Sequence, residues 1–174
     1  MDFLLAALAN TIGSAIGVFF AITASQVIIA RNTVRERRKV VMGLRAAVSH
    51  NQGLLVELTN QFNATNTPTF GLDLTFMVAN AQRKHDVGVS FECCQSLDAV
   101  LYELQHLDTQ VAALRQIWEI NPQGSTEAVR RYAYMVKVAR AQIVVADKHI
   151  SAALTQLQSQ DLRLPTLVVR HPRD

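Results

Sequence analysis

The stretch that decides the fold is residues 3–30, FLLAALANTIGSAIGVFFAITASQVIIA, which holds no charged side chain. As a helix it exceeds the roughly 20 apolar residues that cross a bilayer. A signal peptide would have a basic start and a shorter apolar run, whereas this chain begins Met1-Asp2. The buried core helix of a soluble protein is the other alternative. We predict that residues 1–30 form a transmembrane helix.

Basic charge follows this apolar stretch directly. The chain carries 17 Lys and Arg against 14 Asp and Glu, a formal net charge of +3. Residues beyond 39 hold 12 of each sign, so the whole excess belongs to the first 39 residues. The positive-inside tendency predicts that the basic juxtamembrane segment at residues 31–39 is cytoplasmic. Its basic residues are Arg31, Arg35, Arg37, Arg38 and Lys39.

This orientation places the N-terminus outside the inner (plasma) membrane and the C-terminal domain in the cytoplasm. Setting the orientation is a sufficient role for the basic segment, and binding of anionic lipid or RNA is the alternative. The rest of the chain has no basic excess, so we do not expect it to bind nucleic acid. The lipid bilayer is the first partner that the sequence predicts.

Small and polar residues gather on one face of the predicted span. Gly13 and Gly17 form a GxxxG pair, and small residues continue at the same four-residue spacing. Small residues let two membrane helices approach closely, and Ser or Asn can hydrogen-bond across the contact. We therefore expect a homo-oligomer or an assembly with other membrane-protein subunits; a ring around a pore is an alternative. The predicted packing residues are Ala9, Asn10, Gly13, Ser14, Gly17, Ala21 and Ser25.

Residues 40–160 carry the three-and-four spacing of apolar residues that is typical of amphipathic helices. We expect long helices at about 34–62, 91–120 and 126–158, a short helix at about 72–83, and connections at 63–71, 84–89 and 121–124. The predicted fold is all-α: one transmembrane helix that continues into a cytoplasmic antiparallel bundle of three long helices and one short one. Coiled-coil pairing between chains is the alternative.

Two details refine this prediction. Ala139, Ala146 and Ala153 recur every seven residues, which predicts a seam of close helix packing. Residues 161–174 contain Pro165 and a β-branched run, so we expect an extended C-terminal tail. A strand that pairs with a partner protein is the alternative for this tail.

The sequence lacks the common catalytic and ligand-binding motifs. It contains no GxGxxG, no GxxxxGK[ST], no GxSxG, no HExxH and no CxxC. The five histidines are scattered, and Cys93 falls on an apolar helix stripe, where a buried small side chain is expected. We therefore expect no cofactor, no metal and, most simply, no enzymatic activity.

One short motif does suggest chemistry. Arg45-Ala-Ala-Val-Ser-His50 has the form R-x4-H and resembles the catalytic motif of HEPN ribonucleases, which are helical. The resemblance implies that His50 handles protons and that Arg45 steadies a phosphate of RNA. The second position, often polar in that family, is Ala46 here. An Arg and a His on the solvated side of a helix is the alternative reading.

The layout of the chain has a second resemblance. An apolar N-terminal span, an Arg-rich turn and the helix of Leu44–Leu55 are similar to small bacterial membrane proteins with a cytoplasmic helical domain, including the pore-forming accessory protein of Cas13b systems. The first expectation remains a non-catalytic single-pass scaffold or accessory subunit. The alternative is a membrane-associated phage-defence effector, acting as an oligomeric pore or as a HEPN-like ribonuclease accessory to a CRISPR system.

Overall fold

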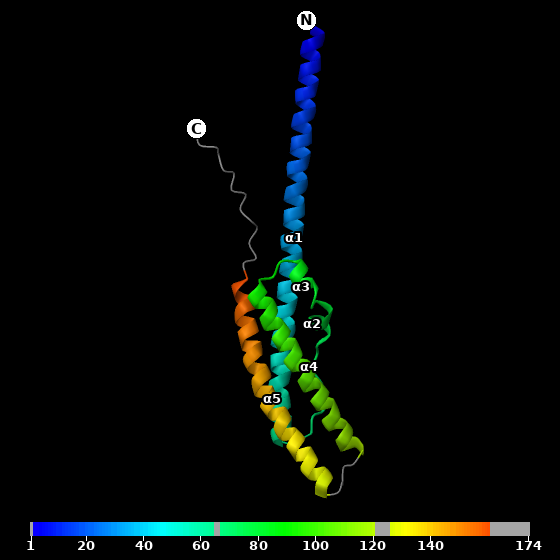
Figure 1. Ribbon diagram of the computed structural model, residues 1–174, viewed down its shortest axis with the longest axis vertical. Helices are drawn as coiled ribbons and strands as arrows, with labels where there is room; N and C mark the ends of the chain where they lie inside the picture. The colour runs from blue at the N-terminus through cyan, green and yellow to red at the C-terminus, as the bar shows by residue number, and fades with distance from the viewer. Residues whose placement is uncertain (1, 65–66, 121–125, 161–174) are drawn as a thin grey trace. The chain divides into compact units, whose positions relative to one another are not determined.

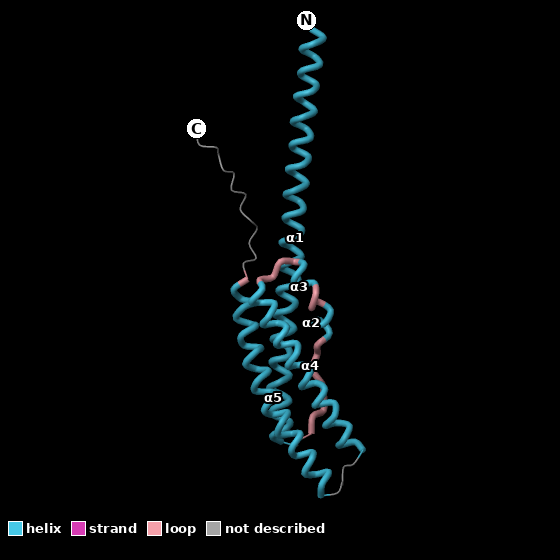
Figure 2. Tube along the Cα trace, in the orientation of Figure 1, coloured by secondary structure: helices cyan, strands magenta, loops and turns pink. Residues whose placement is uncertain are grey.

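The computed structural model describes residues 2–64, 67–120 and 126–160, and for residues 2–12 and 120 it describes the helical backbone alone. Within these ranges the protein is all-helical and has no strand, as expected (Figure 2). The helices are α1 (Asp2–Ala64), α2 (Thr75–Ala79), α3 (Arg83–Asp86), α4 (Phe91–Ile120) and α5 (Thr126–Ser159). The predicted connection at 121–124 and the predicted tail at 161–174 lie outside the described residues.

Helix α1 runs without interruption through the apolar stretch, the basic segment and the first amphipathic pattern. Its contacts nevertheless assign it to two compact units, one containing Met1–Glu36 and the other Arg37–Asp161. The boundary between these units falls inside the basic segment.

In the first unit, α1 stands without a covering layer of side chains. None of the described side chains of residues 13–36 is buried. Among the described helices, α1 is the one that is long and apolar enough to cross a membrane, and none of its apolar window is buried. The described part of the chain therefore does not bury this apolar surface.

In the second unit, the amphipathic stripes form the core. On α1 the buried positions include Val41, Leu44, Val48, Leu55, Leu58 and Phe62, as the three-and-four spacing predicted. The residues at this spacing are likewise buried on α4 from Cys93 to Leu114 and on α5 from Val136 to Leu157. Figure 1 shows α4 and α5 side by side. Ala139, Ala146 and Ala153 of α5 are fully buried, which allows neighbouring helices to approach closely. The apolar spacing of α4 and α5 continues to Trp118 and Val129, but these two side chains are exposed.

Polar contacts define how α5 lies against the second part of α1. Arg37 donates to Gln160, Gln52 donates to Asp147, and Arg140 donates to the carbonyl of Phe62. Residue numbers rise along α1 as they fall along α5, so the two helices run in opposite directions. Gln142 of α5 donates to Glu103 of α4, which links the third long helix to this pair.

The prediction of one short helix at 72–83 was wrong at its start. The amide of Leu72 donates to Asp108 Oδ1 at 2.9 Å, and the amide of Asp73 donates to Asn51 Oδ1 at 3.1 Å. These acceptors, on α4 and α1, hold residues 72–74 in a loop, so α2 begins only at Thr75.

The same prediction was wrong at its end, and so was the connection expected at 84–89. Helix α2 stops at Ala79, where the amide and the side chain of Asn80 both donate to the Phe76 carbonyl, at 3.2 and 2.9 Å. Residues 83–86 then form α3. Helix α3 ends where Gly88 adopts φ 73°, and the amides of Gly88 and Val89 donate back to His85 and Lys84, in a Schellman arrangement.

Candidate functional site

The exposed apolar surface of α1 in the first unit is a candidate site. Ile16, Phe19, Phe20 and Ile29 each expose more than half of their surface, with Phe19 at 68%. A soluble helix does not normally expose large apolar side chains in series. This surface is suited to lipid tails or to other apolar helices.

One threonine on this surface bonds to its own helix. Thr23 Oγ1 donates to the Phe19 carbonyl at 2.8 Å. A hydroxyl that bonds to its own backbone does not need water as a partner. That arrangement lowers the cost of placing a threonine in an apolar environment.

The small residues of α1 present an open face. A methyl group added at Gly13 or Gly17 would meet no atom within 4 Å. Ser14, Ala21 and Ser25 are likewise exposed. For the other two predicted packing residues, Ala9 and Asn10, the structure describes the backbone only. Nothing within the described chain packs against this face.

The basic segment divides into two kinds of residue. Arg31, Arg35, Arg38 and Lys39 are exposed, whereas Arg37 is half-buried. Arg37 donates to Gln160 Oε1 at 3.2 Å. The sequence pattern grouped Arg37 with the others, because a cluster of basic residues carries no sign of which member turns toward the core.

Gln160 is a junction that sequence reasoning missed. Its Oε1 accepts from the Ser90 amide at 3.2 Å, and its Nε2 donates to Ser90 Oγ at 3.0 Å. Together with its contact to Arg37, these bonds join the end of α5 to the turn before α4 and to α1. Three segments distant in sequence therefore meet at one glutamine.

The residues of the R-x4-H motif do not converge. Arg45 and His50 are both exposed on α1. Since each residue turns an α-helix by about 100°, a separation of five places the two side chains about 140° apart around the axis. A single regular helix therefore does not bring an Arg and a His at this spacing to one phosphate.

The cysteines are close to the ion pair of Lys84 and Asp98. Cys93 and Cys94 are both buried, and desolvation, followed by the neighbouring Cys94, raises the pKa of the Cys93 thiol to about 11. Such a thiol stays protonated and unreactive at neutral pH. Lys84, almost fully buried, pairs with the half-exposed Asp98. Nothing in the sequence marked Lys84 as buried, because it follows a helix stop in a polar stretch.

Asn51 is the one polar side chain in the apolar stripe of α1, and it is completely buried. Its Nδ2 donates to the carbonyls of Ala47 at 3.0 Å and Asp73 at 2.7 Å, and its Oδ1 accepts from the Asp73 amide. Asn51 thus fixes the loop after α1 against the core. The gap that it fills in the apolar spacing was the sequence signal.

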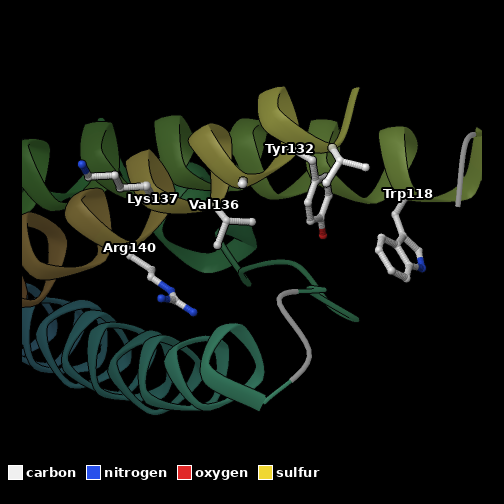
Figure 3. Close-up of a pocket in the computed structure, with 7 residues that line it drawn as sticks. Trp118, Tyr132, Val136, Lys137 and Arg140 are labelled. Carbon is white, nitrogen blue, oxygen red and sulfur yellow. The ribbon is translucent and has the colours of Figure 1, made fainter. Parts of the chain in front are cut away.

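A pocket of about 510 Å³ lies along the first half of α5, from Val129 to Arg140, beside Trp118 of α4. Figure 3 shows Trp118 and Tyr132 at one end, Val136 in the middle, and Lys137 and Arg140 at the other end. The Trp118 and Tyr132 ring centroids are 5.6 Å apart. Burial raises the pKa of the Tyr132 hydroxyl, while its hydrogen bond with Thr67 lowers it.

Metal-binding chemistry has no support in the part of the chain that the structure describes, where no three His, Cys, Asp or Glu side chains group closely enough to hold an ion. Comparisons with protein-family models, with curated proteins and with solved structures found no match to this chain. Its function is therefore argued from its own geometry.

Proposed function

We propose that this chain is a non-catalytic, single-pass membrane protein that acts as an oligomeric scaffold or as an accessory subunit of a membrane assembly. Residues 3–30 of α1 cross the bilayer, and the basic segment lies on the cytoplasmic side. The carrying observation is that no described side chain of residues 13–36 is buried, although this part of α1 is strongly apolar.

An exposed apolar surface of this kind is unfavourable in water. Apolar surface left in water costs roughly 25 cal/mol for each Å². A series of phenylalanines and isoleucines at more than half exposure therefore needs a cover that the described chain does not supply. A bilayer supplies that cover around the whole circumference of a helix. The intrahelical bond of Thr23 supports the same proposal.

The second unit is proposed to be a cytoplasmic antiparallel bundle. The opposed contacts of α1 and α5 and the Gln142–Glu103 contact between α5 and α4 support this arrangement. A compact helical domain on a membrane anchor is suited to hold other proteins in place. The divergent directions of Arg45 and His50 favour this role over a ribonuclease in which one helix supplies both groups.

Membrane extraction tests the span. The full chain should remain in the pellet after alkaline carbonate treatment, with its full mass retained, since an anchor is not removed as a signal peptide is. The double variant Phe19→Arg/Ile22→Arg should move to the supernatant, because each arginine near the centre of a span costs about 2.5–3.5 kcal/mol. Full release of the unaltered chain by carbonate, or loss of its N-terminal mass, would overturn the proposal.

Light scattering in detergent tests the assembly. The unaltered chain should exceed the mass of one copy, and Gly13→Leu/Gly17→Leu should reduce that mass, because leucines hold the helices apart. Gly53→Leu is the matched control, since Gly53 also faces open space but lies in the second unit. An unchanged mass for the double variant would show that this face does not drive association.

A further inference from the structure

The second unit exposes a phenylalanine at the start of α4. Phe91 is the first residue of this helix and exposes 68% of its surface, as much as Phe19 of the proposed span. The turn before it adds Val87, which is half-exposed, and Gly88, which is exposed. These residues form a small apolar edge on a domain whose other phenylalanine, Phe62, is completely buried in the core.

Hydrogen bonds place this edge at a defined end of the second unit. Ser90, immediately before Phe91, donates its amide to Gln160 Oε1 at 3.2 Å, and its hydroxyl accepts from Gln160 Nε2 at 3.0 Å. Arg37, the first residue of the unit, donates to the same Gln160 oxygen at 3.2 Å. The start of α4, the end of α5 and the first residue of the unit therefore lie together, and Figure 1 shows the two helix ends side by side.

This end is also the one from which the chain continues into the proposed span. Only residues 31–36 separate Ala30 from Arg37, and α1 is helical throughout. Seven helical steps advance by about 10 Å. The headgroup layer on each side of a bilayer is roughly 5–8 Å deep. If the proposed span is correct, the end of the unit that carries Phe91 is the end next to the bilayer.

We propose that the second unit rests on the bilayer surface through this end, with the Phe91 ring among the lipid headgroups and the first carbons of the acyl chains. Phenylalanine is one of the residues with which peripheral helices enter this layer. The exposed Asp86 and Glu92 keep their water in the headgroup layer. The inference rests on the proposed function, and it adds a second lipid contact that fixes which end of the unit faces the membrane.

Tyr102 provides a matched control on the same helix. Like Phe91 it is aromatic and exposes 68% of its surface. Because eleven residues separate the two, their rings leave the same face of α4, within about 20° around the axis and about 16 Å apart along it. Lipid at the Gln160 end of the unit therefore reaches Phe91 and not Tyr102.

The test places one tryptophan at a time. The single native tryptophan is replaced as Trp118→Phe, and Phe91→Trp, Tyr102→Trp and Phe19→Trp are made separately in that background. The full chain is reconstituted in phosphatidylcholine vesicles whose acyl chains carry bromine, which quenches indole emission on contact, near the headgroup or near the chain end. We expect Phe91→Trp to lose emission mainly to headgroup-end bromine, Phe19→Trp mainly to chain-end bromine, and Tyr102→Trp to neither.

The reporter in the span separates failure of the inference from failure of the proposed function. Quenching of Phe19→Trp with none at Phe91→Trp would leave the span in place and overturn the surface contact. No quenching of Phe19→Trp by either lipid would overturn the proposed function, and this inference with it.

Two further results would overturn the surface contact alone. Equal quenching of Phe91→Trp and Tyr102→Trp would mean that lipid meets α4 along its length and not at one end. A blue-shifted but unquenched emission from Phe91→Trp would mean that protein, such as a second copy of the chain, covers this ring in place of lipid.

Discussion

The two parts of α1, residues 13–30 and residues 40–62, both carry many apolar side chains, but these side chains are buried only in the second part. From Val40 to Phe62 the apolar residues follow a three-and-four spacing, and the stripe is buried within the second unit. From residue 13 to residue 30 apolar residues surround the helix, and none of them is buried. A one-sided stripe is covered by other helices of the same chain, whereas an apolar helix surface on all sides requires a bilayer or a large protein core.

The largest expected difference between these parts is in the free energy of unfolding lost when a phenylalanine of α1 is replaced by alanine. Phe62 is completely buried and Phe20 is 67% exposed. Phe62→Ala should lower the free energy of unfolding of the second unit by about 3–5 kcal/mol, because it removes buried surface and leaves a cavity. Phe20→Ala should change it by less than about 0.5 kcal/mol. Urea unfolding in detergent, followed by Trp118 emission, measures both. Similar losses for the two variants would break the comparison.

A smaller contrast concerns the polar residue inside the buried stripe. Asn51→Ala removes the partners of the Asp73 amide and carbonyl, and should cost about 1–3 kcal/mol in the free energy of unfolding. Asn60→Ala, at an exposed position of α1, should cost less than about 0.5 kcal/mol. The same urea titration compares them, and an Asn51→Ala chain as stable as the Asn60→Ala chain would contradict the assigned role of Asn51.

The smallest contrast is between two glycines of the second unit. Gly53 faces open space, so Gly53→Ala should stabilise the unit by up to about 1 kcal/mol through helix propensity. A methyl group at Gly43 would overlap the Phe76 ring, which would have to move. Gly43→Ala should therefore stabilise less than Gly53→Ala or destabilise. Thermal unfolding resolves the difference, and equal gains would mean that Phe76 does not depend on Gly43.

The long helices were predictable because the spacing of apolar residues that indicates each helix lies within the helix itself. The bounds of α4 agree with the prediction at both ends, and α5 differs by one residue at its C-terminal end. The apolar spacing also identified the buried stripe of α1 and the buried position of Cys93.

The short helices were not predictable, because distant residues decide them. The loop at 72–74 depends on acceptors from Asn51 and Asp108, which lie 22 and 36 residues away. The junction at Gln160 and the pair of Lys84 with Asp98 also form between segments. The pocket arises because Trp118 and Val129 continue their stripes but remain exposed, which spacing alone does not reveal.

The most direct measurement of the central claim is the location of the two ends of α1 relative to the membrane. Single cysteines introduced as Asp2→Cys and Ser49→Cys are treated in intact cells with a membrane-impermeant maleimide. The native cysteines are buried and do not interfere. We predict that Asp2→Cys is labelled without lysis and that Ser49→Cys, an exposed position, is labelled only after lysis. Labelling of both positions in intact cells, or of neither before lysis, would contradict a single crossing by α1.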